Sequence, residues 1–438
     1  MINKRQIKYL VKKRDSMLND AQVDARVDSL FNEIFNENYD FSKYTRTTLT
    51  QQRKKRQVYN YEKLSCEDIL CQYLKKQLDT TFHIKYASRN KIINLLFNVL
   101  PVIKDMNDFV IVRADFKSFF DTVLIKEINN NYIQSSSLKR YDKELINEYI
   151  KEFKYCHAGL CLSNGMTEII CRDFDQRIKT KLIKYGVFFY ERYVDDIFLL
   201  MNKYISEDKF LEIVNSTIKE VFGDSPVRLS SESEKFTYIA RRNIKAKRTE
   251  KIIFLGYEFE LFFCNENTIN FKYGISEKKR KKHSNIIRRA LLDYSRNGNI
   301  ELLRQRIKIN SARIIISKPI EGYRFEWLTK GIVANYNELQ HHMNRLTKDT
   351  EGFLKSVYYK LFSQYKIPIP HFVKPSKSQA SIYNLFSNVE RNRTIIFHES
   401  IGVSRETLVK WIRKIEPSYR DVGENYNRIV LYYLDLIK

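Results

Sequence analysis

Two short apolar runs, residues 187–190 and 197–200, flank a segment that ends in two adjacent aspartates, Asp195 and Asp196. Both runs are rich in aromatic and aliphatic residues, which favours a β-hairpin with the two carboxylates at its tip. Neighbouring carboxylates on such an apolar hairpin are costly unless a cation neutralises them, because like charges raise each other's pKa. The segment therefore predicts a buried hairpin that carries two carboxylates at one end.

A third carboxylate follows another apolar run. Residues 109–114 are a short β-branched stretch that ends at Asp115, as expected of a buried strand whose end exposes a carboxylate. Other segments show helical spacing of their apolar residues, and one further strand candidate bends at Gly256. The helix candidates are residues 62–80, 88–103, 165–184 and 207–222, and the strand candidate is residues 251–260. The order strand, helix, hairpin, helix, strand predicts an α+β layer.

Asp115, Asp195 and Asp196 together form the ligand set that two Mg²⁺ ions need. Mg²⁺ prefers oxygen ligands and keeps several waters, so a few carboxylates and substrate phosphates complete its shell. Two such ions about 3.5–4 Å apart stabilise the attacking and leaving oxygens of an in-line phosphoryl displacement. The alternative interpretation of Asp195 and Asp196 alone is an ordinary β-turn, in which Asp is common. The full set indicates nucleotidyl transfer.

The composition limits what this chain can bind. Its 77 Lys and Arg exceed its 52 Asp and Glu, and the net charge of +25 over 438 residues favours a polyanionic partner such as a phosphate backbone. Only 12 Gly and 7 Pro argue against a collagen-like or turn-rich all-β chain. No apolar stretch is long enough to cross a bilayer, and residues 1–15 are charged throughout. We therefore expect a cytoplasmic protein with no membrane partner and with reduced cysteines.

Two motifs, which follow one another in the chain in the order and at the spacing expected, resemble those of reverse transcriptases. Residues 189–200 resemble the Tyr-x-Asp-Asp signature of that family, and residues 112–121 resemble its first palm motif, an Asp followed by a short loop and two aromatics. The resemblance implies an α+β right-hand fold, in which fingers and a palm with an antiparallel sheet precede a mainly helical thumb and C-terminal domain. It also implies that Asp115, Asp195 and Asp196 bind two Mg²⁺ ions, for which Mn²⁺ can substitute.

The same resemblance assigns residues to the incoming nucleotide. The backbone from Phe116 to Phe119 would lie against the triphosphate, and Phe120 matches a bulky residue that clashes with a ribose 2′-OH. For Phe120, an ordinary core aromatic is the alternative interpretation. Gly159 and Ser163 match the third motif, although a plain turn also explains Gly159. Positions 157 and 158 depart from that motif: they are His and Ala where Pro and Gln are usual, so the amide that would contact the nucleotide is missing.

Four further positions are similar to functional positions of this family. Lys235 matches a lysine that acts as a general acid toward pyrophosphate, with a merely solvated lysine as the alternative. Leu255 and Gly256 match the hairpin that grips the primer strand. Arg89 lies in a segment that resembles the fingers of bacterial members and is a candidate ligand of the triphosphate.

Basic residues dominate two stretches of the sequence. Residues 278–289 include seven basic and no acidic side chains, which the resemblance places on a thumb helix that tracks nucleic-acid phosphates. The candidates are Lys278, Lys279, Arg280, Lys281 and Lys282, and a solvated helix face is the alternative. Residues 241–248 form the second basic stretch. The polar run 51–56 is expected to be a solvated loop or helix face, and residues 403–415 a bundle helix capped by Ser404.

The resemblance covers residues 60–275 and is closest in flavour to bacterial retron-like and abortive-infection reverse transcriptases. It implies three segments: a helical N-terminal part with fingers at 1–108, a palm at 109–275, and a helical thumb and C-terminal domain at 276–438. The expected activity is RNA-directed DNA synthesis from dNTPs in antiphage defence, with a template or associated non-coding RNA, a DNA product, and a second copy or a defence protein as partner. Template-independent synthesis, protein-primed synthesis and a catalytically dormant nucleic-acid scaffold remain open.

Overall fold

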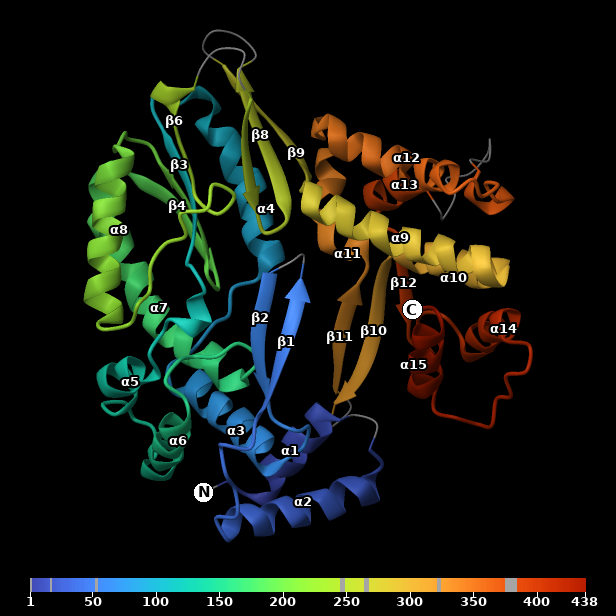
Figure 1. Ribbon diagram of the computed structural model, residues 1–438, viewed down its shortest axis with the longest axis horizontal. Coiled ribbons are helices and arrows are strands. Elements are labelled where there is room, and N and C mark those ends of the chain that lie inside the picture. Colours follow the sequence, from blue (N-terminus) through green and yellow to red (C-terminus); the bar gives the residue numbers. More distant parts are fainter. Residues whose placement is uncertain are drawn as a thin grey trace. The chain divides into compact units, whose positions relative to one another are not determined.

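Contacts along the chain divide the protein into two units, Met1–Ala246 and Lys247–Lys438, whose elements are labelled in Figure 1. The computed structural model describes residues 2–15, 18–51, 54–244, 249–263, 268–320, 324–374 and 384–438. The division between the units precedes the hairpin around Gly256, whereas the sequence analysis grouped that hairpin with the palm and placed its boundary near 275. Both units mix helices with antiparallel strands, which confirms the predicted α+β class.

A four-stranded antiparallel sheet lies at the centre of the first unit, with strand order β4-β5-β3-β6. Its strands are β3 (Val110–Asp115), β4 (Val187–Tyr193), β5 (Asp196–Met201) and β6 (Thr237–Ala240). Every residue of β3 is buried, which explains its unbroken apolar sequence. The predicted strand and hairpin are therefore confirmed.

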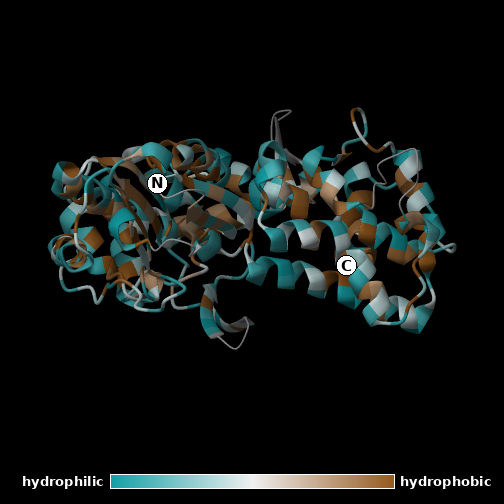
Figure 2. Ribbon diagram, turned by 90° about the horizontal axis from the view of Figure 1, so that it is seen from above, coloured by the Kyte–Doolittle hydropathy of each residue, from teal (hydrophilic) through white to brown (hydrophobic). Residues whose placement is uncertain are grey.

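Two long helices cover one face of this sheet: α7 (Cys161–Leu182) and α8 (Glu207–Phe222). Val112 and Leu199 of the sheet share a hydrophobic core with Phe174 and Phe222 of these helices. α8 begins where the Ser206 hydroxyl accepts a hydrogen bond from the Lys209 N–H, which satisfies a free amide of the first turn. Figure 2 shows hydrophilic and hydrophobic residues on different sides of the helices, as expected for helices packed on one face.

The remaining elements of the first unit surround this layer. They are α1 (Lys4–Arg14), α2 (Asp20–Phe35), β1 (Thr45–Gln51), β2 (Lys54–Asn60), α3 (Cys66–Thr81), α4 (Arg89–Val99), α5 (Ile125–Ile128) and α6 (Arg140–Glu152). The helices expected at 62–80 and 88–103 correspond to α3 and α4. The expectation of a loop or helix face was wrong for Gln51 and for residues 54–56, because β1 and β2 are paired antiparallel strands. Residues 52–53 of that run lie outside the described residues.

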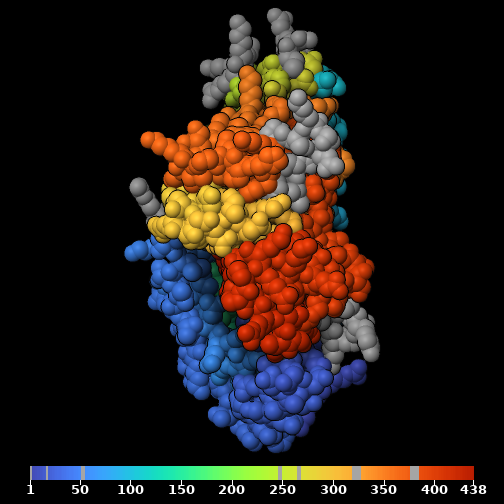
Figure 3. All heavy atoms as spheres, turned by 90° about the vertical axis from the view of Figure 1, so that its right-hand side faces the viewer, coloured from blue at the N-terminus to red at the C-terminus, as the bar shows by residue number. Residues whose placement is uncertain are grey.

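The second unit begins with a three-stranded antiparallel sheet of β7 (Glu250–Phe254), β8 (Tyr257–Phe263) and β9 (Ile269–Ile275). Helices follow it: α9 (Glu277–Asn297), α10 (Ile300–Asn310), α11 (Ile332–Tyr336), α12 (Lys348–Gln364), α13 (Leu385–Glu390), α14 (Arg405–Ile415) and α15 (Tyr426–Leu436). Figure 3 shows α9 and α10 as a yellow band between the orange residues of α12 and the red residues of the C-terminal helices.

The C-terminal part contains a sheet that the sequence analysis missed. It consists of β10 (Arg313–Ile320), β11 (Arg324–Lys330) and β12 (Thr394–Phe397), and β10 pairs with β12 in parallel. The described residues after 276 form seven α-helices, as the expectation of a mainly helical region predicted, but that expectation did not include this sheet. α14 begins after Ser404, whose side chain accepts from the Thr407 N–H, and it buries Leu408, Ile412 and Ile415 as predicted.

None of the helices in the described ranges is long and apolar enough to span a membrane.

Candidate active site

The pairing of β3 with β5 brings the three predicted carboxylates to one end of the sheet. Asp115 is the antiparallel partner of Asp196. Asp195 lies in the two-residue turn between β4 and β5, next to Val194, whose φ of 58° is uncommon for a β-branched residue. The Phe116 N–H donates to the Asp195 carbonyl oxygen at 3.2 Å, which ties this turn to the end of β3. Residues 80 positions apart in sequence thus meet at one site.

Two cationic side chains contact the carboxylates. The Lys235 ammonium forms an ion pair with Asp115, and the Arg113 guanidinium forms one with Asp196. Arg113 is buried, and its Nη1 also donates to the Glu234 carbonyl oxygen at 2.8 Å. This second bond links β3 to the segment that carries Lys235. The structure therefore places Lys235 beside the carboxylates, as its predicted role requires, and adds Arg113, which sequence reasoning missed.

The electrostatics of the turn reflect close, buried like charges. Burial, together with repulsion from Asp115 and Asp196, raises the pKa of Asp195 to about 7. Burial also raises the pKa of Asp196, although the Arg113 guanidinium opposes that shift. A carboxyl group with a raised pKa among neighbouring carboxylates is typical of sites that bind cations or perform acid-base chemistry.

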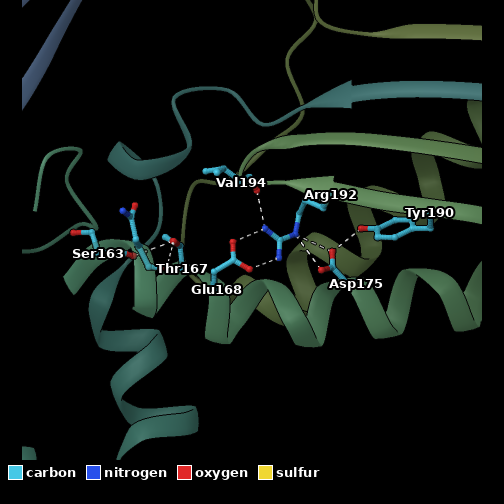
Figure 4. Close-up of polar contacts among 8 residues, drawn as sticks. Ser163, Thr167, Glu168, Asp175, Tyr190, Arg192 and Val194 are labelled. Atoms are coloured by element: carbon cyan, nitrogen blue, oxygen red, sulfur yellow. Dashed lines mark hydrogen bonds and ion pairs between the residues drawn. The ribbon is translucent and has the colours of Figure 1, made fainter. Parts of the chain in front are cut away.

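A buried arginine supports the turn from below (Figure 4). Arg192 of β4 pairs with two carboxylates of α7, Glu168 through both terminal nitrogens and Asp175 through Nε. Its Nη1 also donates to the Val194 carbonyl oxygen at 2.8 Å, and the hydroxyl of Tyr190 donates to Asp175 at 2.6 Å. One side chain therefore holds the strand, the helix and the residue before Asp195 in register.

Sequence analysis overlooked this network, although a signal was present. Glu168 and Asp175 are seven residues apart on a helix, which places them on one face two turns apart. Arg192 is a charged residue within the mostly apolar hairpin of β4 and β5. A buried arginine opposite two acids on the facing helix could have been inferred from that pattern.

The hairpin of β1 and β2 is anchored beside the third motif. The Tyr59 N–H donates to the Ala158 carbonyl oxygen at 2.9 Å, and the His157 ring stacks on Tyr59 with a centroid distance of 4.1 Å. Gly159 has a φ of 102°, and a Cβ atom there would lie 2.4 Å from the Tyr59 carbonyl oxygen. Glycine is therefore required for the approach of β2. His157 and Ala158, which depart from the family motif, make part of this junction.

The other predicted nucleotide ligands have varied positions. The Phe116 ring is buried in an aromatic core and its N–H is used by Asp195, so Phe116 serves the structure. Phe120 is half-buried, with its centroid 5.9 Å from that of Phe119. Ser163 is fully buried in the first turn of α7, which leaves its side chain no access to a nucleotide. Arg89 is half-buried at the first position of α4.

The predicted nucleic-acid contacts of the second unit lie on β7, β8 and α9. Leu255 and Gly256 form the turn between the two strands, both with positive φ, as predicted for a tight bend. Lys278, Lys279, Lys281 and Lys282 are exposed on α9. Arg280 is not exposed: it is buried, pairs with Asp349 at 3.1 Å and donates to the Ile275 carbonyl oxygen. Its predicted role in nucleic-acid binding is wrong, because the basic run winds around a helix and one residue faces inward. Residues 245–248 of the second basic stretch lie outside the described residues.

A pocket of about 1080 Å³ adjoins the Arg192 network in the first unit. Its walls come from residues 81–95, from α7 and from β4, and they include Glu168 and Arg192. Lys91 and Lys179 add positive charge to the same walls. The pocket gives a substrate of nucleotide size room beside the elements that hold the carboxylate turn.

The donor set suits a hard divalent cation, because three carboxylates offer only oxygen ligands. Among the residues that the structure describes, however, no three His, Cys, Asp or Glu side chains are arranged as a ready-made metal site. Lys235 and Arg113 neutralise two of the carboxylates instead. A metal at this site would therefore compete with the Lys235 ammonium for Asp115.

No protein-family model and no curated protein matches this chain. Among solved structures it is similar to apo telomerase from Candida tropicalis, truncated from its C-terminal domain, with 13% identity, a TM-score of 0.36, and coverage of 52% of this chain and 55% of that chain. It is also similar to telomerase from Candida albicans in complex with a fragment of telomeric RNA, with 14% identity, a TM-score of 0.41, and coverage of 90% and 65%. The chain thus spans less than two thirds of either telomerase chain, and TM-scores this low support no conclusion about it.

Proposed function

We propose that this protein is a reverse-transcriptase-like DNA polymerase that transfers dNTPs to a growing DNA strand. The observation that carries the proposal is the meeting of Asp115, Asp195 and Asp196 at one end of the sheet, with Lys235 on Asp115. Carboxylates in this arrangement, on an antiparallel sheet backed by two helices, are what the two sequence motifs predicted. The basic character of the chain suits nucleic-acid substrates.

Asp115, Asp195 and Asp196 would hold Mg²⁺, or Mn²⁺ in its place. When bound, a pair of these ions stabilises the attacking and leaving oxygens of phosphoryl transfer. The chain's own residues provide orientation and protons: Arg192 fixes the turn that presents Asp195, and the Lys235 Nζ carries a proton that it can give to the pyrophosphate oxygen. Arg113 orients Asp196 by its ion pair.

The finer parts of the proposal concern substrate and setting. Phe120 follows Asp115 closely in the sequence and is half-buried. Its bulk would favour dNTPs over rNTPs. An RNA template or an associated non-coding RNA is the proposed nucleic-acid partner, and antiphage defence in bacteria is the proposed setting. Both rest on the resemblance of residues 60–275 to defence-associated reverse transcriptases.

Untemplated DNA synthesis is the second candidate function, and one observation favours it. The position at which an amide would contact the incoming nucleotide is Ala158, which is buried and carries a methyl group. Its neighbour His157 is occupied by stacking on Tyr59 and by a contact of 3.4 Å with Asp121. The hairpin of β1 and β2 is thereby fixed beside a position that lacks the usual contact with the nucleotide.

Sequencing of the reaction products separates these candidates. Purified full-length protein is incubated with each dNTP and Mg²⁺, with and without the RNA that co-purifies with it. A DNA product complementary to that RNA supports templated synthesis, and a product unrelated to it supports untemplated synthesis. No incorporation of any dNTP, with Mg²⁺ or with Mn²⁺, would contradict the proposed function.

A further inference from the structure

Four basic side chains of the second unit gather where α10, α14 and the start of β12 meet. They are Arg304 and Lys308 of α10, Arg393 directly before β12, and Lys414 of α14, and we call them the Lys308 cluster. The Lys308 Nζ lies over the ring of Trp411, 3.3 Å from its centroid. α10 and α14 are in contact and share one hydrophobic core with β12, so the fold holds these charges together.

The cluster has little built-in negative charge. Within the described ranges, Lys308, Arg393 and Lys414 form no ion pair with a carboxylate, and Arg304 is 3.5 Å from Glu301. Burial and the three neighbouring cations lower the pKa of Lys308 to about 8. Confined like charges cost folding free energy, so a fold that retains Lys308, Arg393 and Lys414 without a carboxylate partner among the described residues gains nothing in stability from them.

A hollow of about 640 Å³ on α14 continues the positive surface. Lys410, Arg413 and Lys414 line it, so Lys414 belongs to both features. Glu406 and Asp421 also line the hollow, but Asp421 is paired with Arg405 at 2.6 Å. The result is a concave surface with a net excess of positive charge on one helix, next to the Lys308 cluster.

We propose that the Lys308 cluster and the α14 hollow bind the phosphate backbone of a single-stranded nucleic acid. Lysine and arginine are the side chains that contact phosphates, and a strand fits a concave surface better than a flat membrane does. Bound phosphates would neutralise the charges that the fold confines. The site lies in the second unit and involves none of the three carboxylates, so it can exist whether or not the proposed polymerase activity does.

Fluorescence anisotropy of the full-length protein tests this site. The probes are single-stranded RNA and DNA of the same sequence, about 20 nucleotides long, at salt concentrations of about 50–200 mM. The variant Lys308→Gln with Lys414→Gln removes two charges from the site. The matched control, Lys348→Gln with Lys360→Gln, removes two exposed charges from α12 of the same unit.

The site variant is expected to bind roughly tenfold more weakly than the control, independently of base sequence, with a salt slope reduced by about 0.7 per lost contact. Loss on either probe supports the proposal, and the comparison of RNA with DNA identifies the preferred strand. Equal affinity and equal slope for the two double variants would overturn it.

Two further measurements separate nucleic acid from other anions. Vesicles with about 30% phosphatidylserine test a membrane surface, and cluster-dependent binding to vesicles without cluster-dependent binding to either strand overturns the proposal. Thermal unfolding of the protein without ligand distinguishes a binding role of the cluster residues from a structural one. The site variant should be at least as stable as wild type while it binds less strand, whereas a large loss of stability would assign these residues to the core and overturn the proposal.

Discussion

The carboxylate turn of the first unit and the Lys308 cluster of the second each bring like charges together, but they differ in whether the fold supplies opposite charges beside them. At the turn, three aspartates meet, and Lys235 and Arg113 each pair with one of them. Beneath it, Arg192 is matched by Glu168 and Asp175. At the Lys308 cluster, cations meet and the nearest compensation is the ring of Trp411. The cations of the first region are matched by carboxylates, whereas in the second region Lys308, Arg393 and Lys414 have no carboxylate partner among the described residues and only Arg304 lies near one, Glu301.

The contrast indicates which of the two regions is expected to bind an external ligand. Paired buried charges are expensive to break, because the remaining partner is left without solvent. Unpaired confined charges are cheap or favourable to remove, unless a ligand uses them. Mutations in the two regions should therefore change stability with opposite signs.

The largest effect is expected at Arg192. Arg192→Met removes the buried guanidinium and leaves the half-buried carboxylates of Glu168 and Asp175 without their cation, which should cost about 3 kcal/mol of unfolding free energy. Urea unfolding followed by circular dichroism measures it. The control Arg177→Gln, which breaks the pair of the exposed Arg177 with Asp173 within α7, should change stability by less than about 1 kcal/mol. Similar losses for both variants would show that Arg192 is not a central support.

His283 extends the comparison to a buried group that is neutral. It is buried on α9 against Phe353, and burial lowers its pKa from 6.5 to about 4. Below pH 6.5 the unfolded chain binds a proton that the folded chain does not, so stability falls as the pH drops from 6.5 toward 4. At pH 4.5 this contribution should be about 2–3 kcal/mol.

The His283→Leu variant isolates that contribution. Carboxyl groups titrate in the same range in both proteins, so only the difference between the two pH profiles reports on His283. We expect the variant to lose less stability than wild type between pH 7 and pH 4.5 in urea unfolding. Parallel profiles would mean that His283 is protonated as readily in the folded chain as in the unfolded one.

The smallest effect is expected at Lys308. Lys308→Met should stabilise the protein by about 1–2 kcal/mol at pH 7, because it relieves the repulsion between Lys308 and its neighbouring cations. The gain is small because the variant also loses the contact of the ammonium with the Trp411 ring. The gain should shrink as the pH rises above 8, because the folded wild-type chain then releases a proton that its unfolded form keeps up to pH 10.5. A variant less stable than wild type at pH 7 would erase the contrast between the two regions.

Much of the first unit could be predicted from local patterns. The run 109–114, the hairpin at 187–200 and the helix at 207–222 each have one period and clear ends, and the structure contains all three. The proximity of Asp115 and Asp196 could also be predicted, because two buried apolar strands can pair in only a few registers. Local pattern and tertiary structure agree where one face of an element is buried.

The features that were missed depend on distant pairings. β10 and β12 are parallel partners whose sequences lie about eighty residues apart, and the short run at 394–397 predicts no strand by itself. Arg280 belongs to a uniformly basic run, so only the packing of α9 on α12 reveals that it faces inward. The Lys308 cluster draws on three separate segments, none of which is unusual alone.

Incorporation of labelled dNTPs by Asp195→Asn is the most direct test of the claim that the three carboxylates form one catalytic site. The control is Asp105→Asn, an exposed aspartate close to β3 in the chain. We predict that Asp195→Asn folds and binds nucleic acid like wild type but incorporates nucleotides at least about a thousandfold more slowly, whereas Asp105→Asn keeps the wild-type rate. Incorporation by Asp195→Asn at the wild-type rate would contradict the account.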